Sequence, residues 1–219
     1  MKRKITCYCD SSFEIDTPTE INLDKNPDYL EEILDGSFFS FVCKKCKKKH
    51  KPEYPLKLIW AEKKLNMEVF PEQERSAFYK KESAPIKKGS EAAEVIIGYP
   101  EMADRLAVIK EGLNPIVIET IKYYLYLKAE EENQEGELNI WFYAKKKGKT
   151  AKEALLEFHI HGLLRDEVAK MQIPFELYEK TLDDYKKNPK AEIYKELKVK
   201  NYLSVKNTMR VESDSSVRS

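Results

Sequence analysis

The stretch FVCKKCKKKHK at residues 41–51 decides how the first third of this chain folds. It holds Cys43 and Cys46 with two lysines between them, and the other two cysteines, Cys7 and Cys9, lie far upstream. Two close pairs of cysteines with a long gap are typical of a zinc site. Zn²⁺ takes four soft ligands in a tetrahedron, and two tight turns can supply two thiolates each. We therefore predict that these four cysteines bind one structural zinc ion.

The same residues leave other interpretations open. The Cys7–Cys9 pair has one residue fewer than the usual two between its cysteines, and the gap between the pairs exceeds the usual 15 to 20 residues, roughly. Four reduced structural thiols are one alternative, and a disulfide is another, which a reducing compartment disfavours. If one thiol of the first pair is out of reach, His50 is the reserve ligand, because it follows Cys46 by four residues.

The residues around the cysteines read as a small unit rich in strands. Asn26, Pro27 and Gly36 bracket a predicted helix at 28–35, so the long gap between the cysteine pairs is a folded insertion. Alternation of apolar and polar residues predicts strands at 4–7, 13–16, 54–60 and 65–70, and an apolar run at 37–42 leads into the second cysteine turn. A domain of about 70 residues has a marginal core, so a structural metal would decide whether it folds.

Four stretches of the chain resemble the CpXC family, which is named for two Cys-Pro-x-Cys turns. They are ITCYCDSSFEID at 5–16, LDGSFFSFVCKKC at 34–46, EYPL at 53–56 and EGLNPIVIETIKYYLYLKA at 111–129. Two features depart from the family pattern: Lys44 stands in place of proline, and the first turn lacks both its proline and one residue. The resemblance implies a zinc-ribbon-like amino-terminal domain and zinc binding, and it implies no activity.

The second half of the chain predicts a separate α+β domain. Residues 71–93 are polar, contain two prolines and read as a linker; the α+β domain follows at 94–206, and 207–219 form a polar, mobile tail. Within the domain, a helix from 116 to about 130 is apolar around nearly its whole circumference, so we expect it to be covered on more than one side. His159 and His161 share one face of a predicted strand and are a weak candidate for a metal or catalytic role. The fold class is therefore α+β, with a zinc-ribbon-like domain at 1–70.

Composition excludes several classes of enzyme. The chain has 219 residues and only seven glycines, none close enough together for a dinucleotide fingerprint, a phosphate loop or a nucleophile elbow. No acid is placed by sequence beside a base or a nucleophile, so an enzyme is the weakest of three hypotheses.

No apolar run is long enough to span a bilayer and no export signal is visible, so we expect a cytoplasmic protein.

The chain is nearly neutral overall, but positive charge is concentrated in one segment. The net charge is +1, yet residues 44–51 hold six lysines. Such lysines either offset the negative charge of a four-thiolate zinc centre or contact the phosphates of RNA or DNA, although no aromatic residue interrupts the cluster. We favour a non-enzymatic, zinc-stabilised module that binds a protein partner or a second copy of itself. The alternative is nucleic-acid binding through Lys44, Lys45, Lys47, Lys48, Lys49 and Lys51.

Overall fold

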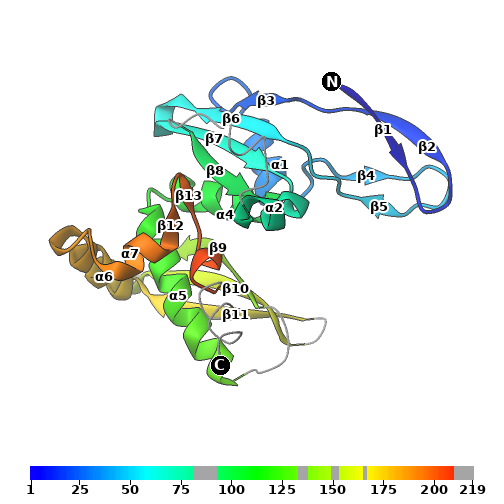
Figure 1. Ribbon diagram of the computed structural model, residues 1–219. Coiled ribbons are helices and arrows are strands. Elements are labelled where there is room, and N and C mark those ends of the chain that lie inside the picture. The colour runs from blue at the N-terminus through cyan, green and yellow to red at the C-terminus, as the bar shows by residue number, and fades with distance from the viewer. Residues whose placement is uncertain (81–92, 133–137, 149–152, 165–166, 210–219) are drawn as a thin grey trace. The chain divides into compact units, whose positions relative to one another are not determined.

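The computed structural model describes residues 1–80, 93–132, 138–148, 153–164 and 167–209 (Figure 1). The chain divides into two compact units, residues 1–103 and 104–219. Both contain helices and strands, so the predicted α+β class is confirmed. Within the described residues, no helix combines the length and the apolar character that crossing a membrane requires.

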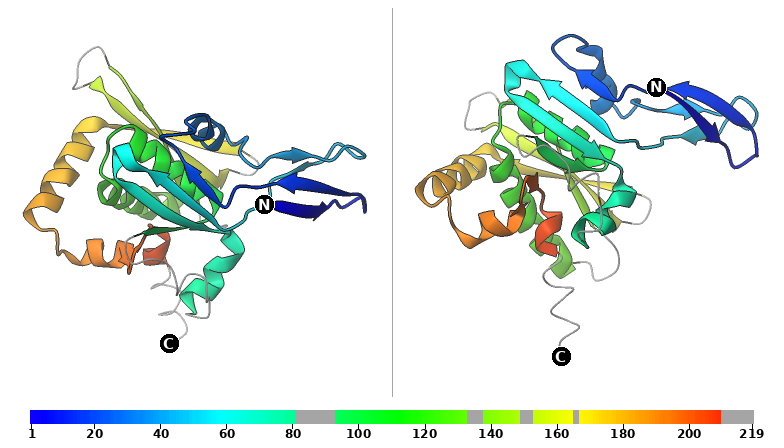
Figure 2. Two further views of the ribbon diagram at one scale, coloured as in Figure 1. Left: turned by 90° about the horizontal axis from the view of Figure 1, so that it is seen from above. Right: turned by 45° about the horizontal axis from the view of Figure 1, so that its top comes forward.

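Two hairpins carry the cysteines in the first unit. Strands β1 (Lys2–Thr6) and β2 (Ser12–Asp16) pair antiparallel, and so do β4 (Phe41–Val42) and β5 (Lys49–His50). The two hairpins lie side by side and extend from the rest of this unit (Figures 1 and 2). Few apolar side chains are buried in them, chiefly Ile5 and Ile15. The hairpins therefore have little core of their own.

A sheet forms the body of the first unit. Strands β3 (Glu20–Asn22), β6 (Leu56–Trp60), β7 (Leu65–Phe70) and β8 (Glu94–Ile97) are neighbours in the order β8-β7-β6-β3. The β6–β7 pair is antiparallel, and the two flanking pairs are parallel. The short helices of this part are α1 (Asp28–Leu34), η1 (Ala61–Lys63), η2 (Glu72–Glu74) and α2 (Arg75–Tyr79). Alternating side chains of the sheet, such as Leu58 and Met67, are fully buried, as the period of a strand requires.

An aromatic cluster joins the hairpins to this sheet. The ring of Phe39 lies 6.4 Å from that of Tyr54 and 5.8 Å from that of Tyr99, measured between centroids. The Tyr99 hydroxyl donates to the Tyr54 carbonyl at 3.0 Å, and the Arg3 guanidinium of β1 stacks 4.2 Å above the Tyr54 ring. The base of the hairpins is thus packed against the sheet, whereas their far end, where the cysteines lie, extends away from it (Figure 1).

The second unit packs helices on an antiparallel sheet. Strands β9 (Asn139–Lys146), β10 (Leu155–Leu164) and β11 (Glu167–Pro174) run in the order β11-β10-β9, and α5 (Pro115–Glu132) contacts β9. Helix α4 (Tyr99–Lys110) begins in the first unit and ends in the second. The remaining elements are α6 (Phe175–Lys187), α7 (Glu192–Leu197), and the paired strands β12 (Lys198–Val199) and β13 (Tyr202–Leu203).

The predicted domain boundaries remain predictions, because the division at 103/104 is drawn on compactness and does not test them. The expected linker at 71–93 contains η2 and α2, and its residues 81–92 lie outside the described part of the chain. Of the expected tail at 207–219, Asn207 and Thr208 are buried and 210–219 lie outside the described residues. The Asn207 side chain donates to the Leu197 carbonyl at 2.9 Å, which explains why this polar residue packs inward.

Candidate metal centre

The second cysteine turn closes the β4–β5 hairpin. The Cys43 carbonyl accepts a hydrogen bond from the N–H of Lys47, and the Cys43 N–H donates to the carbonyl of Lys48, both at 2.9 Å. Lys47 follows Cys46 directly and has φ 62°, in the left-handed region that glycine usually occupies. This turn therefore directs both cysteine side chains to one side.

The first cysteine turn is built in the same way with one residue fewer. The Cys7 carbonyl accepts from the N–H of Asp10 at 2.9 Å, and the Cys7 N–H donates to the carbonyl of Ser11 at 2.8 Å. Asp10 follows Cys9 directly and has φ 63°. The missing residue is thus removed from between the cysteines, and the bonds that close the turn are kept.

The structure brings the four cysteine sulfurs together. Cys7 Sγ is 3.4 Å from Cys46 Sγ, Cys9 Sγ is 3.7 Å from Cys43 Sγ, and all four sulfurs lie within 4.8 Å of one another. A tetrahedron with metal–sulfur bonds of about 2.3 Å has sulfurs about 3.8 Å apart. All four cysteines are free thiols, and Cys7 and Cys43 are buried. The group could therefore hold one metal ion.

Two polar side chains lie against the sulfurs. The Ser11 hydroxyl is 3.1 Å from Cys9 Sγ and 3.2 Å from Cys43 Sγ, so it bridges the two turns. His50 Nε2 is 3.2 Å from Cys7 Sγ. His50, the predicted reserve ligand, thus lies beside the four-sulfur group in a position to hydrogen-bond it. Such outer contacts orient metal ligands and tune their basicity.

Hydrogen bonds divide the thiols by acidity. The backbone N–H of Cys46, followed by the Ser11 hydroxyl, lowers the pKa of Cys43 to about 5, and Ser11 also lowers the pKa of Cys9. At Cys7 the backbone N–H of Cys9 favours the thiolate, but burial and the neighbouring thiols outweigh it and raise the pKa to about 12. Several adjacent thiols cannot all ionise without a cation, so a bound metal would complete this charge balance.

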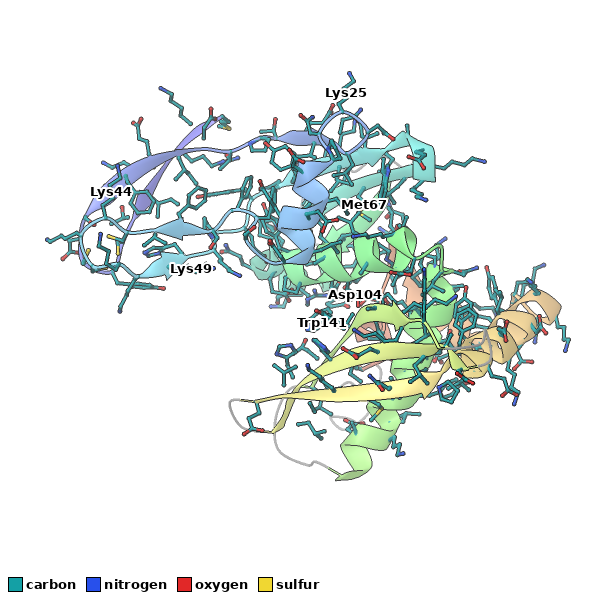
Figure 3. All side chains as sticks on the ribbon, turned by 180° about the vertical axis from the view of Figure 1, so that it is seen from behind. Lys25, Lys44, Lys49, Met67, Asp104 and Trp141 are labelled. Atoms are coloured by element: carbon teal, nitrogen blue, oxygen red, sulfur yellow. The ribbon has the colours of Figure 1, made fainter. Side chains whose placement is uncertain are left out.

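The six lysines of the basic cluster are all exposed on or beside the second turn: Lys44, Lys45, Lys47, Lys48, Lys49 and Lys51. Figure 3 labels Lys44 and Lys49 on these hairpins. Sequence reasoning found no aromatic residue within this cluster, but the fold adds one from the first turn. Tyr8 is 86% exposed, its ring stacks on that of His50 at 5.8 Å, and Lys48 Nζ lies 5.5 Å from its centroid. In the sequence, the position of Tyr8 between two cysteines was the signal that could have placed this aromatic side chain at the metal site.

The predicted histidine pair does not belong to a metal group. His159 Nε2 is 3.3 Å from Glu157 Oε1, and its ring stacks on Tyr143 at 4.1 Å. Across the ranges that the structure describes, the four cysteines are the one group of His, Cys, Asp or Glu side chains that qualifies. His159 and His161 therefore have no third ligand there.

A buried charged network in the second unit was missed by sequence reasoning. Lys122 on α5 is only 2% exposed, and its Nζ lies 2.5 Å from Asp104 Oδ2 on α4 and 2.8 Å from Glu119 Oε1. Arg105 adds a second cation 3.7 Å from Glu119. The network joins two helices inside an apolar core (Asp104 is labelled in Figure 3).

Backbone groups occupy the remaining carboxylate oxygens of this network. Asp104 Oδ1 accepts the N–H of Phe142 on β9 at 2.5 Å, and Glu119 Oε2 accepts the N–H of Val205 at 2.8 Å. Each of the four carboxylate oxygens therefore has a donor. This arrangement is typical of a structural clamp, since a general acid or base needs an oxygen that can reach a substrate.

Comparison with known proteins gives a family and a relative. The sequence model of the CpXC protein family matches residues 5–122, which include both cysteine turns and the start of α5. An uncharacterised protein of Treponema pallidum (strain Nichols) is 27% identical over 217 residues, covering 93% of this chain and 97% of the relative. No solved structure matches the chain.

Proposed function

Because the chain belongs to the CpXC family, whose two cysteine turns it carries in altered form, we propose that its amino-terminal unit is a non-catalytic binding module held in shape by one structural zinc ion. The ligands would be Cys7, Cys9, Cys43 and Cys46. One observation carries the proposal: four thiols from two remote turns have their sulfurs within 4.8 Å of one another. A tetrahedral set of four sulfurs suits zinc, and iron is the competing metal for such a site.

The composition of the ligand set supports a structural role. Catalytic zinc sites use three protein ligands and keep a fourth position for water or substrate, whereas structural sites use four. With all four thiolates bound, no position stays open on a tetrahedral ion. The proposal therefore assigns no reaction to this centre.

The hairpins have a thin core, so a bound metal would contribute much of their stability. A two-stranded hairpin is marginally stable by itself, and β4 and β5 have only two residues each. Structural zinc contributes about 10–16 kcal/mol in small zinc domains. A bound ion would therefore decide whether the far end of these hairpins is ordered. The identity of a protein partner, or self-association, stays a prediction.

Elemental analysis of the full chain, purified without chelators, tests the proposal. We expect about one zinc per chain, and almost none in the double variant Cys43→Ser/Cys46→Ser. The matched control is His159→Ala/His161→Ala, which removes the other candidate ligands and should keep the zinc. Replacement of the metal by Co²⁺ gives a second readout, because the visible spectrum reports tetrahedral thiolate coordination. Iron in place of zinc, or full metal content in the cysteine variant, would overturn the proposal.

A further inference from the structure

We propose that the end of the paired hairpins binds single-stranded nucleic acid, with Tyr8 stacking on a base and the surrounding lysines contacting phosphates. This surface, the tip, consists of the two cysteine turns and the adjoining β5: Tyr8, Asp10, Lys44, Lys45, Lys47, Lys48, Lys49, His50 and Lys51. The inference rests on the proposed zinc centre, because the ion would hold the tyrosine turn against the lysine turn.

Tyr8 has the placement of a stacking platform. Its ring is 86% exposed, although large aromatic side chains usually bury most of their surface. One face is supported by the His50 ring, which lies 5.8 Å away at an interplanar angle of 23°. His50 is itself held by Cys7 Sγ at 3.2 Å and by the ring of Phe13 at 6.1 Å. The tyrosine is therefore presented outward on a prearranged support.

The charge of the tip is that of a phosphate-binding surface. The six lysines outweigh Asp10, the nearby Asp35 and the formal charge of about minus two of a four-thiolate zinc centre. About two positive charges remain after this offset, so neutralising the metal centre does not account for all the lysines. Lys48 lies over the Tyr8 ring itself, with Nζ 5.5 Å from the centroid. Charge and aromatic surface thus occur together at one place.

This combination favours a single strand over a duplex or an acidic peptide. Proteins that bind single strands without sequence preference join a basic surface to aromatic rings, and each stacked base contributes about 1–3 kcal/mol. In a duplex the bases are already stacked, so an exposed ring gains little from them. An acidic peptide would use the lysines but has no planar group to place on Tyr8.

Fluorescence anisotropy with a labelled oligothymidine of about 12 nucleotides tests the inference on the full, metal-loaded chain. We expect binding that weakens with salt, with a slope of log affinity against log salt near −4 if all six lysines meet phosphates. Tyr8→Ala should weaken binding about 5-fold to 150-fold, and Tyr8→Phe should keep it. Lys44→Gln/Lys45→Gln/Lys48→Gln should reduce the slope by about 2.

Controls separate this inference from its alternatives. Lys180→Gln/Lys186→Gln/Lys187→Gln removes the same charge from exposed positions on α6 and should leave binding unchanged. Equal affinity for the duplex, no effect of Tyr8→Ala, or displacement of the strand by polyglutamate at equal charge would each overturn the proposal. Zinc content is measured on every sample. Absent binding with one zinc per chain rejects this inference alone, whereas absent zinc rejects the proposed function as well.

Discussion

The cysteine cluster of the first unit and the charged network of the second meet the same need by different chemistry. Each joins segments far apart in sequence: Cys7 meets Cys46 39 residues later, and Glu119 meets Val205 86 residues later. The cluster brings together thiols that cannot all ionise side by side, and under the proposed function an external cation balances their charge. The network contains its own cations, Lys122 and Arg105, so its carboxylates need no external cation.

The surroundings explain the difference. In the two hairpins that carry the cysteines, Ile5 and Ile15 are among the few buried apolar side chains. Most other side chains of the hairpins are exposed to solvent or only partly buried. Around Lys122, residues of α4 and α5 such as Leu106 and Ile121 are fully buried. The two hairpins are too thin to gain enough stability from burial, whereas the apolar core of the second unit can enclose charges only if every charge is paired. We therefore expect loss of metal to destabilise the cysteine cluster and not the charged network, and loss of a buried charge to destabilise the network.

Metal removal should have the largest effect and should be confined to the first unit. We expect a strong chelator to abolish the protection of backbone amides in β1, β2, β4 and β5, because a contribution of about 10–16 kcal/mol is lost there. Amides of β9 and β10 should keep their protection. Hydrogen exchange followed by mass spectrometry measures both in one sample. Equal protection of the hairpins with and without metal would contradict the comparison.

Removing the buried lysine should have the next largest effect, and in the second unit. Lys122→Met leaves the carboxylates of Asp104 and Glu119 buried with too little positive charge, so we expect a loss of about 3–5 kcal/mol in the free energy of unfolding. Lys128→Met changes an exposed lysine of the same helix and should cost less than about 0.5 kcal/mol. Denaturant titration gives both values. Comparable losses in the two variants would show that the network contributes nothing specific.

What sequence reasoning found follows from local signals. Pro27 and Gly36 predicted the helix that the structure places at Asp28–Leu34. The apolar helix predicted from 116 is α5, with Val117, Ile118 and Ile121 buried. The two cysteine turns also followed from spacing, because each turn is closed by hydrogen bonds among neighbouring residues. Each of these features is decided within one or two turns of chain.

What it missed depends on contacts between distant segments. Glu119 and Lys122 appear in the sequence as polar interruptions of an apolar helix, and their meaning depends on Asp104 in another helix. The apolar run at 37–42 is a strand only at Phe41–Val42, since Phe39 turns with φ 49° to pack on Tyr54 and Tyr99. Tyr8 joins the lysines only through the pairing of two hairpins. Apart from the position of Tyr8 between two cysteines, no local pattern carries this information.

Substitution of His50 should have a smaller effect on the metal centre. His50→Leu removes the contact with Cys7 Sγ, and loss of an outer partner typically weakens metal binding about 10-fold to 100-fold. His161→Leu is the matched control and should leave zinc affinity unchanged. Competition with a chromogenic chelator measures the affinities. Complete loss of zinc from His50→Leu, together with normal binding by Cys9→Ser, would show that His50 is a ligand in place of Cys9.

The smallest and most gradual effect should come from alkaline pH. Burial by itself would lower the pKa of Lys122, but the carboxylates of Asp104 and Glu119 outweigh it and raise the pKa above the ordinary 10.5. A lysine whose pKa is higher in the folded state stabilises that state fully below 10.5, and the contribution is lost as pH rises through the folded-state value. The difference in unfolding free energy between wild type and Lys122→Met should therefore narrow as the pH rises above 10.5. Tyrosines ionise in the same range in both proteins, so the difference isolates Lys122. A difference that narrows already at neutral pH would mean that the lysine is not held by its carboxylates, and the contrast with the cysteine cluster would fail.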